Sequence, residues 1–159
     1  MYPHKLPSPP VDQSPGQSMT DLEKIVAFVA RNHVVTICSA KGGVPWAANC
    51  FYVLDQDAMA LVVMSEPKTR HASEWLENDL VAGTISNQEA SVARLQGIQY
   101  TARTCLLEGA DKRHAFQLYL KRFPIAAVHS APIWHIALET VKFTDNTLGF
   151  GSKMLWERN

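Results

Sequence analysis

The first regular pattern of hydrophobic and polar positions lies near residue 20. Thr20 and Glu23 have the spacing of a capping box, in which side chains satisfy the free backbone N–H groups of a helix start. The next apolar side chains recur at the spacing of one helix face: Leu22, Ile25, Val26 and Val29. The pattern predicts an amphipathic helix that begins after Thr20 and ends near Asn32.

From residue 33 the pattern changes to β-branched and apolar residues interrupted by turn residues. Segments 33–40 and 46–55 are separated by Lys41-Gly42-Gly43, and a third segment, 58–64, is apolar throughout. Short turns between such segments predict antiparallel pairing. The uninterrupted apolar run predicts a strand that is buried on both faces.

The rest of the chain alternates between helical and extended patterns. A short helix is expected over 69–78, and a second over 111–122 is ended by Pro124. Further strands are expected at 81–86 and 92–107, and one or two more at 133–144. Gly97, inside the longest strand, suggests a β-bulge. Six or so strands with tight turns predict a mainly β fold with helices (α+β), a small antiparallel barrel rather than a doubly wound parallel sheet.

Composition divides the chain into a tail and one domain. Five prolines fall within residues 1–18, together with Ser and Gln, and this composition predicts a disordered tail. Residues 19–159 have the length of a single domain. Fifteen Lys and Arg balance fifteen Asp and Glu, so no global field directs the protein to nucleic acid or to an anionic membrane.

Several absences from the sequence bear on location and metal content. The longest purely apolar run is far shorter than the roughly 20 residues of a membrane-spanning helix, and the N-terminus lacks the apolar core of a secretory signal. The cysteines, Cys38, Cys50 and Cys105, form no CxxC pattern and are interpreted as free thiols. We therefore expect a cytoplasmic protein with no metal site.

The densest polar cluster follows the third expected strand. Its members are Ser65, Lys68, Thr69, Arg70 and His71. The cluster leads into a helix start, where free backbone N–H groups and the helix dipole favour an anion. Two cations and two hydroxyls can surround a phosphate there. The alternative is a solvated loop in which Thr69 only caps the helix, and spacing alone does not decide between them.

Two other regions hold candidate binding residues. Small residues on the second strand leave room for a flat ligand beside Ala48, Asn49, Cys50 and Phe51, although Asn49 could equally be a structural, hydrogen-bonded amide. Near the chain end, glycines that permit close backbone approach surround Asn146, Phe150, Lys153 and Trp156. There the alternative is a terminus that packs on its own domain.

Several segments together resemble a known superfamily. They are His33-Val34-Val35-Thr36, Ala48-Asn49-Cys50-Phe51-Tyr52, Lys68-Thr69-Arg70-His71-Ala72, Arg122-Phe123-Pro124, Ser130-Ala131-Pro132 and Lys142-Phe143-Thr144-Asp145-Asn146-Thr147-Leu148-Gly149-Phe150-Gly151. Over about residues 21–157 the chain resembles the FMN-binding split barrels related to pyridoxamine 5′-phosphate oxidase, and among these the YhbP-like proteins. The terminal segment is the most specific part of the resemblance.

The resemblance implies a six-stranded antiparallel split β-barrel that forms a homodimer, with FMN in clefts at the dimer interface. Family members hold the phosphate with residues that correspond to Ser65, Lys68, Thr69 and Arg70. The flavin ring would rest against the second strand near Ala48 to Phe51. Residues of the partner chain close the cleft, and Trp134 and the terminal segment are expected there.

The leading functional hypothesis is an FMN-dependent oxidoreductase that acts on an unknown small molecule. A flavin carries the redox chemistry itself, which agrees with the absence of a recognisable catalytic dyad, and no catalytic residue is assigned. The substrate residues of the true oxidase have no convincing match. The alternatives are a flavin carrier without turnover and a haem-binding split barrel, for which His71 is a possible axial ligand. No nucleic acid or membrane partner is expected.

Overall fold

The computed structural model describes residues 18–159, so all but the last residue of the expected tail lies outside the described part of the chain. The α-helices are α1 (Asp21–Arg31), α2 (Arg70–Glu77) and α3 (Gly109–Arg122). The strands are β1 (Val34–Lys41), β2 (Val44–Asp55), β3 (Ala60–Met64), β4 (Leu80–Ser86), β5 (Gln96–Leu106), β6 (Ile133–Asp145) and β7 (Lys153–Glu157). Short 3₁₀ turns occur at η1 (Val92–Arg94), η2 (Pro124–Ala127) and η3 (Asn146–Leu148).

Six strands form a closed ring, which confirms the expected split barrel. Their order is β3-β2-β1-β4-β5-β6, and pairing of β3 with β6 closes the ring. All of these pairings are antiparallel. The seventh strand, β7, lies outside the ring on the edge of β6. The sequence pattern did not predict β7, because its five residues follow a glycine-containing loop and alternate too briefly to be recognised.

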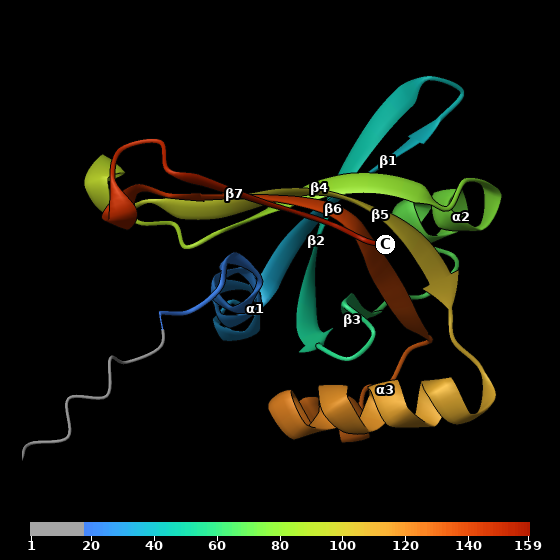
Figure 1. Ribbon diagram of the computed structural model, residues 1–159. Helices are drawn as coiled ribbons and strands as arrows, with labels where there is room; N and C mark the ends of the chain where they lie inside the picture. The colour runs from blue at the N-terminus through green and yellow to red at the C-terminus, as the bar shows by residue number, and fades with distance from the viewer. Residues whose placement is uncertain (1–17) are drawn as a thin grey trace, which may run out of the picture.

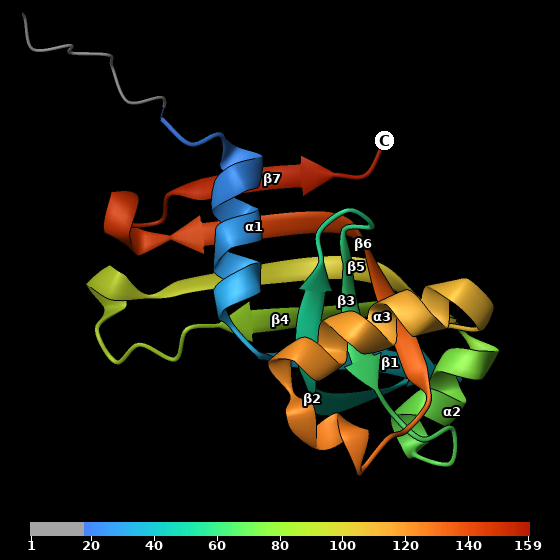
Figure 2. The same ribbon diagram turned by 90° about the horizontal axis from the view of Figure 1, so that it is seen from below.

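The helices lie around the barrel in three places. α1 and α3 lie on the same side of the long sheet, which leaves the opposite side without a helix (Figure 1). Seen from below, α1 crosses strands β4–β7, whereas α2 and α3 lie at the other end of the molecule (Figure 2). The β1–β2 hairpin projects beyond the sheet (Figure 1).

The first helix forms as predicted, with a shifted buried face. Thr20 and Glu23 make both hydrogen bonds of the capping box. Ile25, Phe28 and Val29 are buried, but Leu22 is 41% exposed, so the apolar stripe is rotated from the one expected. The sheet beneath the helix causes this rotation, because the Phe28 ring packs 4.9 Å from the ring of Phe143.

The third strand is buried on both faces, as its apolar run predicted. Leu61 and Val63 belong to the barrel core, whereas Val62 packs with Ala115 and Tyr119 of α3. This arrangement fixes the end of β3, from which the candidate phosphate-binding residues continue.

The prediction for residues 92–107 was wrong in two respects. This segment is a 3₁₀ turn followed by β5, and the irregular register lies between Thr101 and Ala102. Gly97 pairs regularly with both neighbouring strands. Its lack of a side chain reflects close packing instead, since a Cβ there would lie 3.1 Å from the Ile85 carbonyl oxygen.

Candidate functional site

The polar residues between β3 and α2 are here called the Ser65 cluster (Ser65, Lys68, Thr69, Arg70 and His71), and the fold brings the side chains of Ser65, Thr69 and His71 into contact. The Oγ of Ser65 lies 2.7 Å from Nε2 of His71 and 3.1 Å from Oγ1 of Thr69. Thr69 Oγ1 is 3.2 Å from the same His71 nitrogen. The indole N–H of Trp134 donates to the Ser65 carbonyl at 3.0 Å. Three polar side chains thus converge at one end of the barrel.

Thr69 caps α2, so this part of the simpler sequence interpretation is correct. Its hydroxyl donates to the Glu66 carbonyl at 2.8 Å and accepts from the Ala72 N–H at 3.3 Å. The backbone N–H groups of Arg70 and His71, the first two residues of the helix, have no intrahelical acceptor. They give the cluster two donors suited to an anion.

The Arg70 side chain is largely engaged within the protein. Its Nε donates to Glu74 at 2.9 Å, and its guanidinium lies 4.2 Å from the centre of the Trp46 ring on the β1–β2 hairpin. Glu74 is 4% exposed and also accepts from the Ser39 hydroxyl at 2.5 Å. The hydrogen bond from Ser39, followed by that from Arg70, holds the Glu74 pKa below its ordinary value. Much of the Arg70 charge is therefore offset.

Lys68 remains the available cation of the cluster. Its side chain is exposed and makes no ion pair with any residue between 18 and 159. Burial lowers the pKa of His71, although Glu74 partly opposes this shift, so the imidazole is neutral at neutral pH. Lys68 is thus the cation of the cluster that no carboxylate neutralises within residues 18–159.

The strand residues expected beside the ring alternate between the two faces of β2. Ala48 and Cys50 are half-buried and face the barrel, whereas Asn49 and Phe51 are exposed on the outer face. Burial raises the pKa of Cys50 to about 11, so its sulfur is a thiol rather than a thiolate. Phe51 stacks on His33 with 6.1 Å between ring centres. Asn49 accepts a hydrogen bond from the Thr36 hydroxyl at 2.8 Å.

Trp134 does not lie where the sequence interpretation placed it. The side chain is 1% exposed and packs against Trp75 with 5.3 Å between ring centres. Because the ring is enclosed by the barrel core, it offers no surface that could close a cleft between two subunits. Its contact with the candidate site is the indole hydrogen bond that positions the Ser65 backbone.

The terminal block, defined as residues 146–156, lies away from the Ser65 cluster in the same chain. The two regions flank opposite ends of β6: Ile133 pairs with Met64 next to Ser65, whereas Asp145 precedes the block. The 12 residue steps between them span at most roughly 40 Å. Figure 1 shows η3 at one extremity of the molecule and α2 towards the other.

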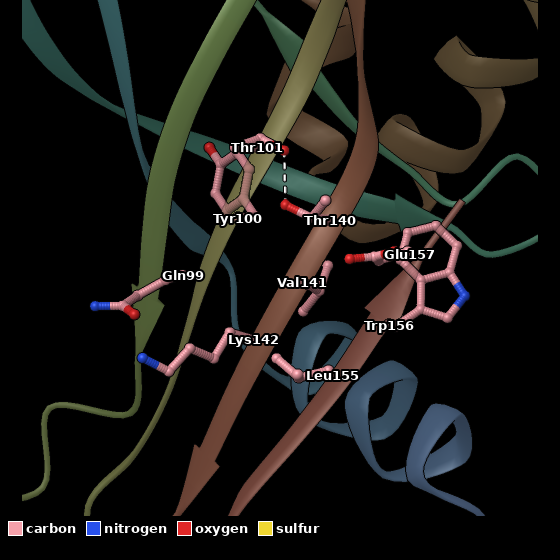
Figure 3. A pocket seen from close by; sticks show the side chains of 9 residues that line it. All are labelled: Gln99, Tyr100, Thr101, Thr140, Val141, Lys142, Leu155, Trp156 and Glu157. Carbon is pink, nitrogen blue, oxygen red and sulfur yellow. Dashed lines mark hydrogen bonds between the residues drawn. The ribbon is translucent and has the colours of Figure 1, made fainter. Parts of the chain in front are cut away.

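The four candidate residues of the terminal block have different surroundings. Asn146 is structural, because its side chain donates to the Val92 carbonyl at 2.7 Å and accepts from the Gly151 N–H at 3.0 Å. Phe150 is 85% exposed, and Lys153 is exposed at the start of β7. Trp156 packs partly on the core, and it also lines a shallow pocket of about 340 Å³ over β5, β6 and β7 (Figure 3).

Three residues around the Ser65 cluster were missed by sequence reasoning. Glu74 had a usable signal, since it follows Arg70 by four residues on a helix and such pairs meet on one face. Ser39 and Trp46 had none, because the hairpin brings them to α2 from more than 20 residues away.

The closed ring of six antiparallel strands defines the protein as a split barrel, and solved structures share this fold. A structure of a haem-binding protein from Mycobacterium smegmatis matches with a TM-score of 0.75 and 16% identity, over 88% of this chain and 59% of that chain. A putative pyridoxamine 5′-phosphate oxidase from Listeria innocua matches at 0.62 and 18% identity, over 77% and 96%. An FAD-binding protein from Mesorhizobium loti matches at 0.59 and 18% identity, over 74% and 90%.

Sequence relatives show the family more narrowly. A UPF0306 protein from Serratia proteamaculans is 46% identical over 136 residues, which are 86% of this chain and 94% of the relative. The UPF0306 protein YhbP of Escherichia coli is 45% identical over 141 residues, or 89% and 96% of the two chains. The chain therefore belongs to the UPF0306 family. No family model matches it. Within residues 18–159, no helix has the length and apolar character needed to cross a membrane.

Proposed function

We propose that the protein binds FMN and acts as a flavin-dependent oxidoreductase on a small molecule. The observation that carries the proposal is the Ser65 cluster. There, the Ser65 hydroxyl is hydrogen-bonded to His71 at the start of α2, which carries two free N–H groups, and Lys68 precedes this helix with an exposed side chain that is unpaired among residues 18–159. These groups fit a phosphate monoester, which needs several donors and a cation. When bound, the flavin ring would supply the hydride or electron transfer, and the protein would supply binding and orientation.

The residues of this chain would divide the binding between them. Lys68 and the N–H groups of Arg70 and His71 would hold the phosphate, while His71 keeps the Ser65 hydroxyl in place. The flavin ring would lie near Ala48 to Phe51, where half-buried small side chains adjoin exposed ones. Arg70 would contribute mainly by joining α2 to the β1–β2 hairpin through Glu74 and Trp46.

The proposal includes a homodimer. Phe150, at 85% exposure, and Leu155, at 73%, are large apolar side chains that the protomer leaves uncovered, and such surfaces commonly mark interfaces. The start of the terminal block and the Ser65 cluster also adjoin opposite ends of β6 in one chain. A two-fold related copy would be needed to bring the two regions together.

Titration of the purified protein with FMN, riboflavin and FAD tests the cofactor. FMN should bind most tightly, because only it presents a terminal phosphate monoester to the Ser65 cluster. Equal affinity for riboflavin would reject the phosphate site. A parallel titration with haem tests the other alternative, which requires Nε2 of His71 to leave Ser65 and bind iron. If haem bound and FMN did not, the flavin proposal would be wrong.

Reduction of the bound FMN by NADH or NADPH, followed by reoxidation, separates an oxidoreductase from a flavin carrier. Multiple turnovers with a small-molecule acceptor support the enzyme. Bound flavin that no nicotinamide reductant can reduce would instead support the carrier.

A further inference from the structure

The outer face of strands β1, β2 and β4 carries a polar groove of about 420 Å³, here called the neutral groove. Its hydrogen-bonding side chains include Asn32, Thr36, Asn49, Thr84 and Ser86, and His33 is the one ionisable side chain in its lining. None of its lining residues is Asp, Glu, Lys or Arg. The volume is within the range of small-molecule sites. A groove that is rich in hydrogen-bonding groups and free of formal charge favours an uncharged polar ligand, since an ionic one would lose hydration without a compensating partner.

Strand register arranges the groove in rows. Thr36 pairs with Asn49 on one side and with Thr84 on the other, so three polar side chains stand side by side across three strands. Adjacent strands are about 4.8 Å apart, so this row is roughly 10 Å long. Two residues along each strand towards the hairpin turn, the small side chains Ala47, Cys38 and Ala82 form a parallel row that lies outside the groove. On the other side of the polar row the lining continues to His33, Val34 and Ser86, so a flat ring bound in the groove would have its polar edge against the polar row.

The hydrogen bonds within the polar row fix what it offers to a ligand. The Thr36 hydroxyl donates to Oδ1 of Asn49 at 2.8 Å, which orients the amide. The Nδ2 group of Asn49 then has no acceptor among residues 18–159, and it remains available as a donor. Tyr100 donates to the Thr36 carbonyl at 3.1 Å from inside the barrel, so the backbone beneath the row is held in place.

The nearest charges along the chain are directed elsewhere. Arg31 donates to the side chain of Gln96, and Glu89 pairs with Arg94 at 3.2 Å. Arg122, which packs at the end of α1, donates to the backbone carbonyls of Ala30 and Arg31. The formal charges around the groove therefore stand outside its lining. This distinguishes it from the Ser65 cluster, where Lys68 and the free N–H groups favour an anion.

We infer that the neutral groove binds an uncharged planar heterocycle through an amide or imide edge, with the Asn49 amide as the main contact. The inference deepens the proposed function, since Asn49 adjoins the expected flavin ring position. Two sources share this chemistry: the uracil-like edge of the flavin itself, and the nicotinamide of a reductant. A carboxylate or phosphate in the same place is disfavoured.

Nicotinamide and nicotinate are matched probes, because they share a ring and differ in an amide against a carboxylate. In flavin-free protein, nicotinamide should shift the Asn49 side-chain amide resonance in a saturable way, and nicotinate should bind at least about tenfold more weakly. Asn49→Ala should weaken nicotinamide binding about two- to tenfold, the loss expected for one neutral hydrogen bond. Gln117→Ala, on the exposed face of α3, serves as the control.

Nicotinate that bound as tightly as nicotinamide, or an Asn49→Ala variant with unchanged affinity, would overturn the inference. A repeat with saturating FMN separates the two sources. Retained nicotinamide binding assigns the groove to a second heterocycle, and its loss assigns the groove to the flavin edge. If FMN itself failed to bind, the proposed function would fall while the flavin-free result stood.

Discussion

The Ser65 cluster and the terminal block both contain cations and aromatic rings. They differ in how far their side chains are bound within the protomer. Ser65, Thr69 and His71 bond to one another, and Trp134 and Glu74 fix their surroundings. The terminal block presents Phe150 and Leu155 to solvent at 85% and 73% exposure. The side chains of the first region are thus held in place by contacts within one chain. The second is ordered by η3 and β7 but leaves apolar surface that a single chain does not use.

Substitutions at Met154 and Phe150 test this comparison within the terminal block. Their expected difference in the free energy of unfolding is the largest effect that we predict. Met154 is 5% exposed and packs in the core, so Met154→Ala should cost about 2–5 kcal/mol of the free energy of unfolding. Phe150→Ala should change it by no more than about 0.5 kcal/mol, as expected for a surface site. Denaturant unfolding at a concentration that keeps both variants monomeric measures the two values.

Sedimentation of the same variants tests the interface. Phe150→Ala should shift the equilibrium from dimer towards monomer, because it removes a large apolar side chain from the proposed contact. If Phe150→Ala instead destabilised the monomer as much as Met154→Ala does, the block would pack only on its own chain.

Lys68 and Arg70 provide the second comparison, within the Ser65 cluster. Lys68→Ala should weaken FMN about 10- to 150-fold, the value of one charge-assisted hydrogen bond, and leave the melting temperature unchanged. Arg70→Ala should lower the melting temperature, because Glu74 then loses its cation and Trp46 its stacking partner. Calorimetry of both variants, with and without FMN, distinguishes the roles. If Arg70→Ala kept full stability and lost FMN, Arg70 would be a direct phosphate ligand.

The sequence predicted the parts of the fold that local patterns determine. The capping box at Thr20 and the apolar run of β3 gave a helix and a doubly buried strand in the right places. The phosphate-binding candidates followed from a strand end that leads into a helix start, and the structure brings Ser65, Thr69 and His71 together.

The errors arose where distant segments decide the environment. Nothing local marks Trp134 as a core residue rather than a surface one, since its burial depends on pairing between β3 and β6 and on Trp75 of α2. The neutral groove is equally non-local, because strand register aligns Asn49, Thr36 and Thr84 from three strands. Arg70 looked free in the sequence because its second contact, Trp46, lies on the hairpin.

The pH dependence of stability gives the smallest and most specific test of the Ser65 cluster. Hydrogen bonds from Ser39 and Arg70 lower the Glu74 pKa in the folded state. The ionised carboxylate therefore stabilises the fold above the unfolded glutamate pKa of about 4.3, and this contribution disappears as pH falls through the lower folded value. Glu74→Gln removes the charge and with it this dependence. The stability difference between wild type and Glu74→Gln should be largest at neutral pH and shrink below about pH 4.

Other groups titrate in acid, so the difference between the two proteins is the quantity to measure. Burial lowers the His71 pKa, so stability also falls as pH drops below the unfolded histidine pKa of about 6.5. This pH range is separate from that of Glu74. Glu77→Gln is the matched control, because Glu77 lies on the same helix in an exposed pair with Lys41 and such pairs contribute little. Urea unfolding between neutral pH and pH 3 gives the three profiles. A Glu74→Gln profile parallel to that of wild type would show that the fold does not favour the charged form of the Glu74 carboxylate. The surroundings of the Ser65 cluster would then be no more fixed by internal bonds than those of the solvent-exposed terminal block.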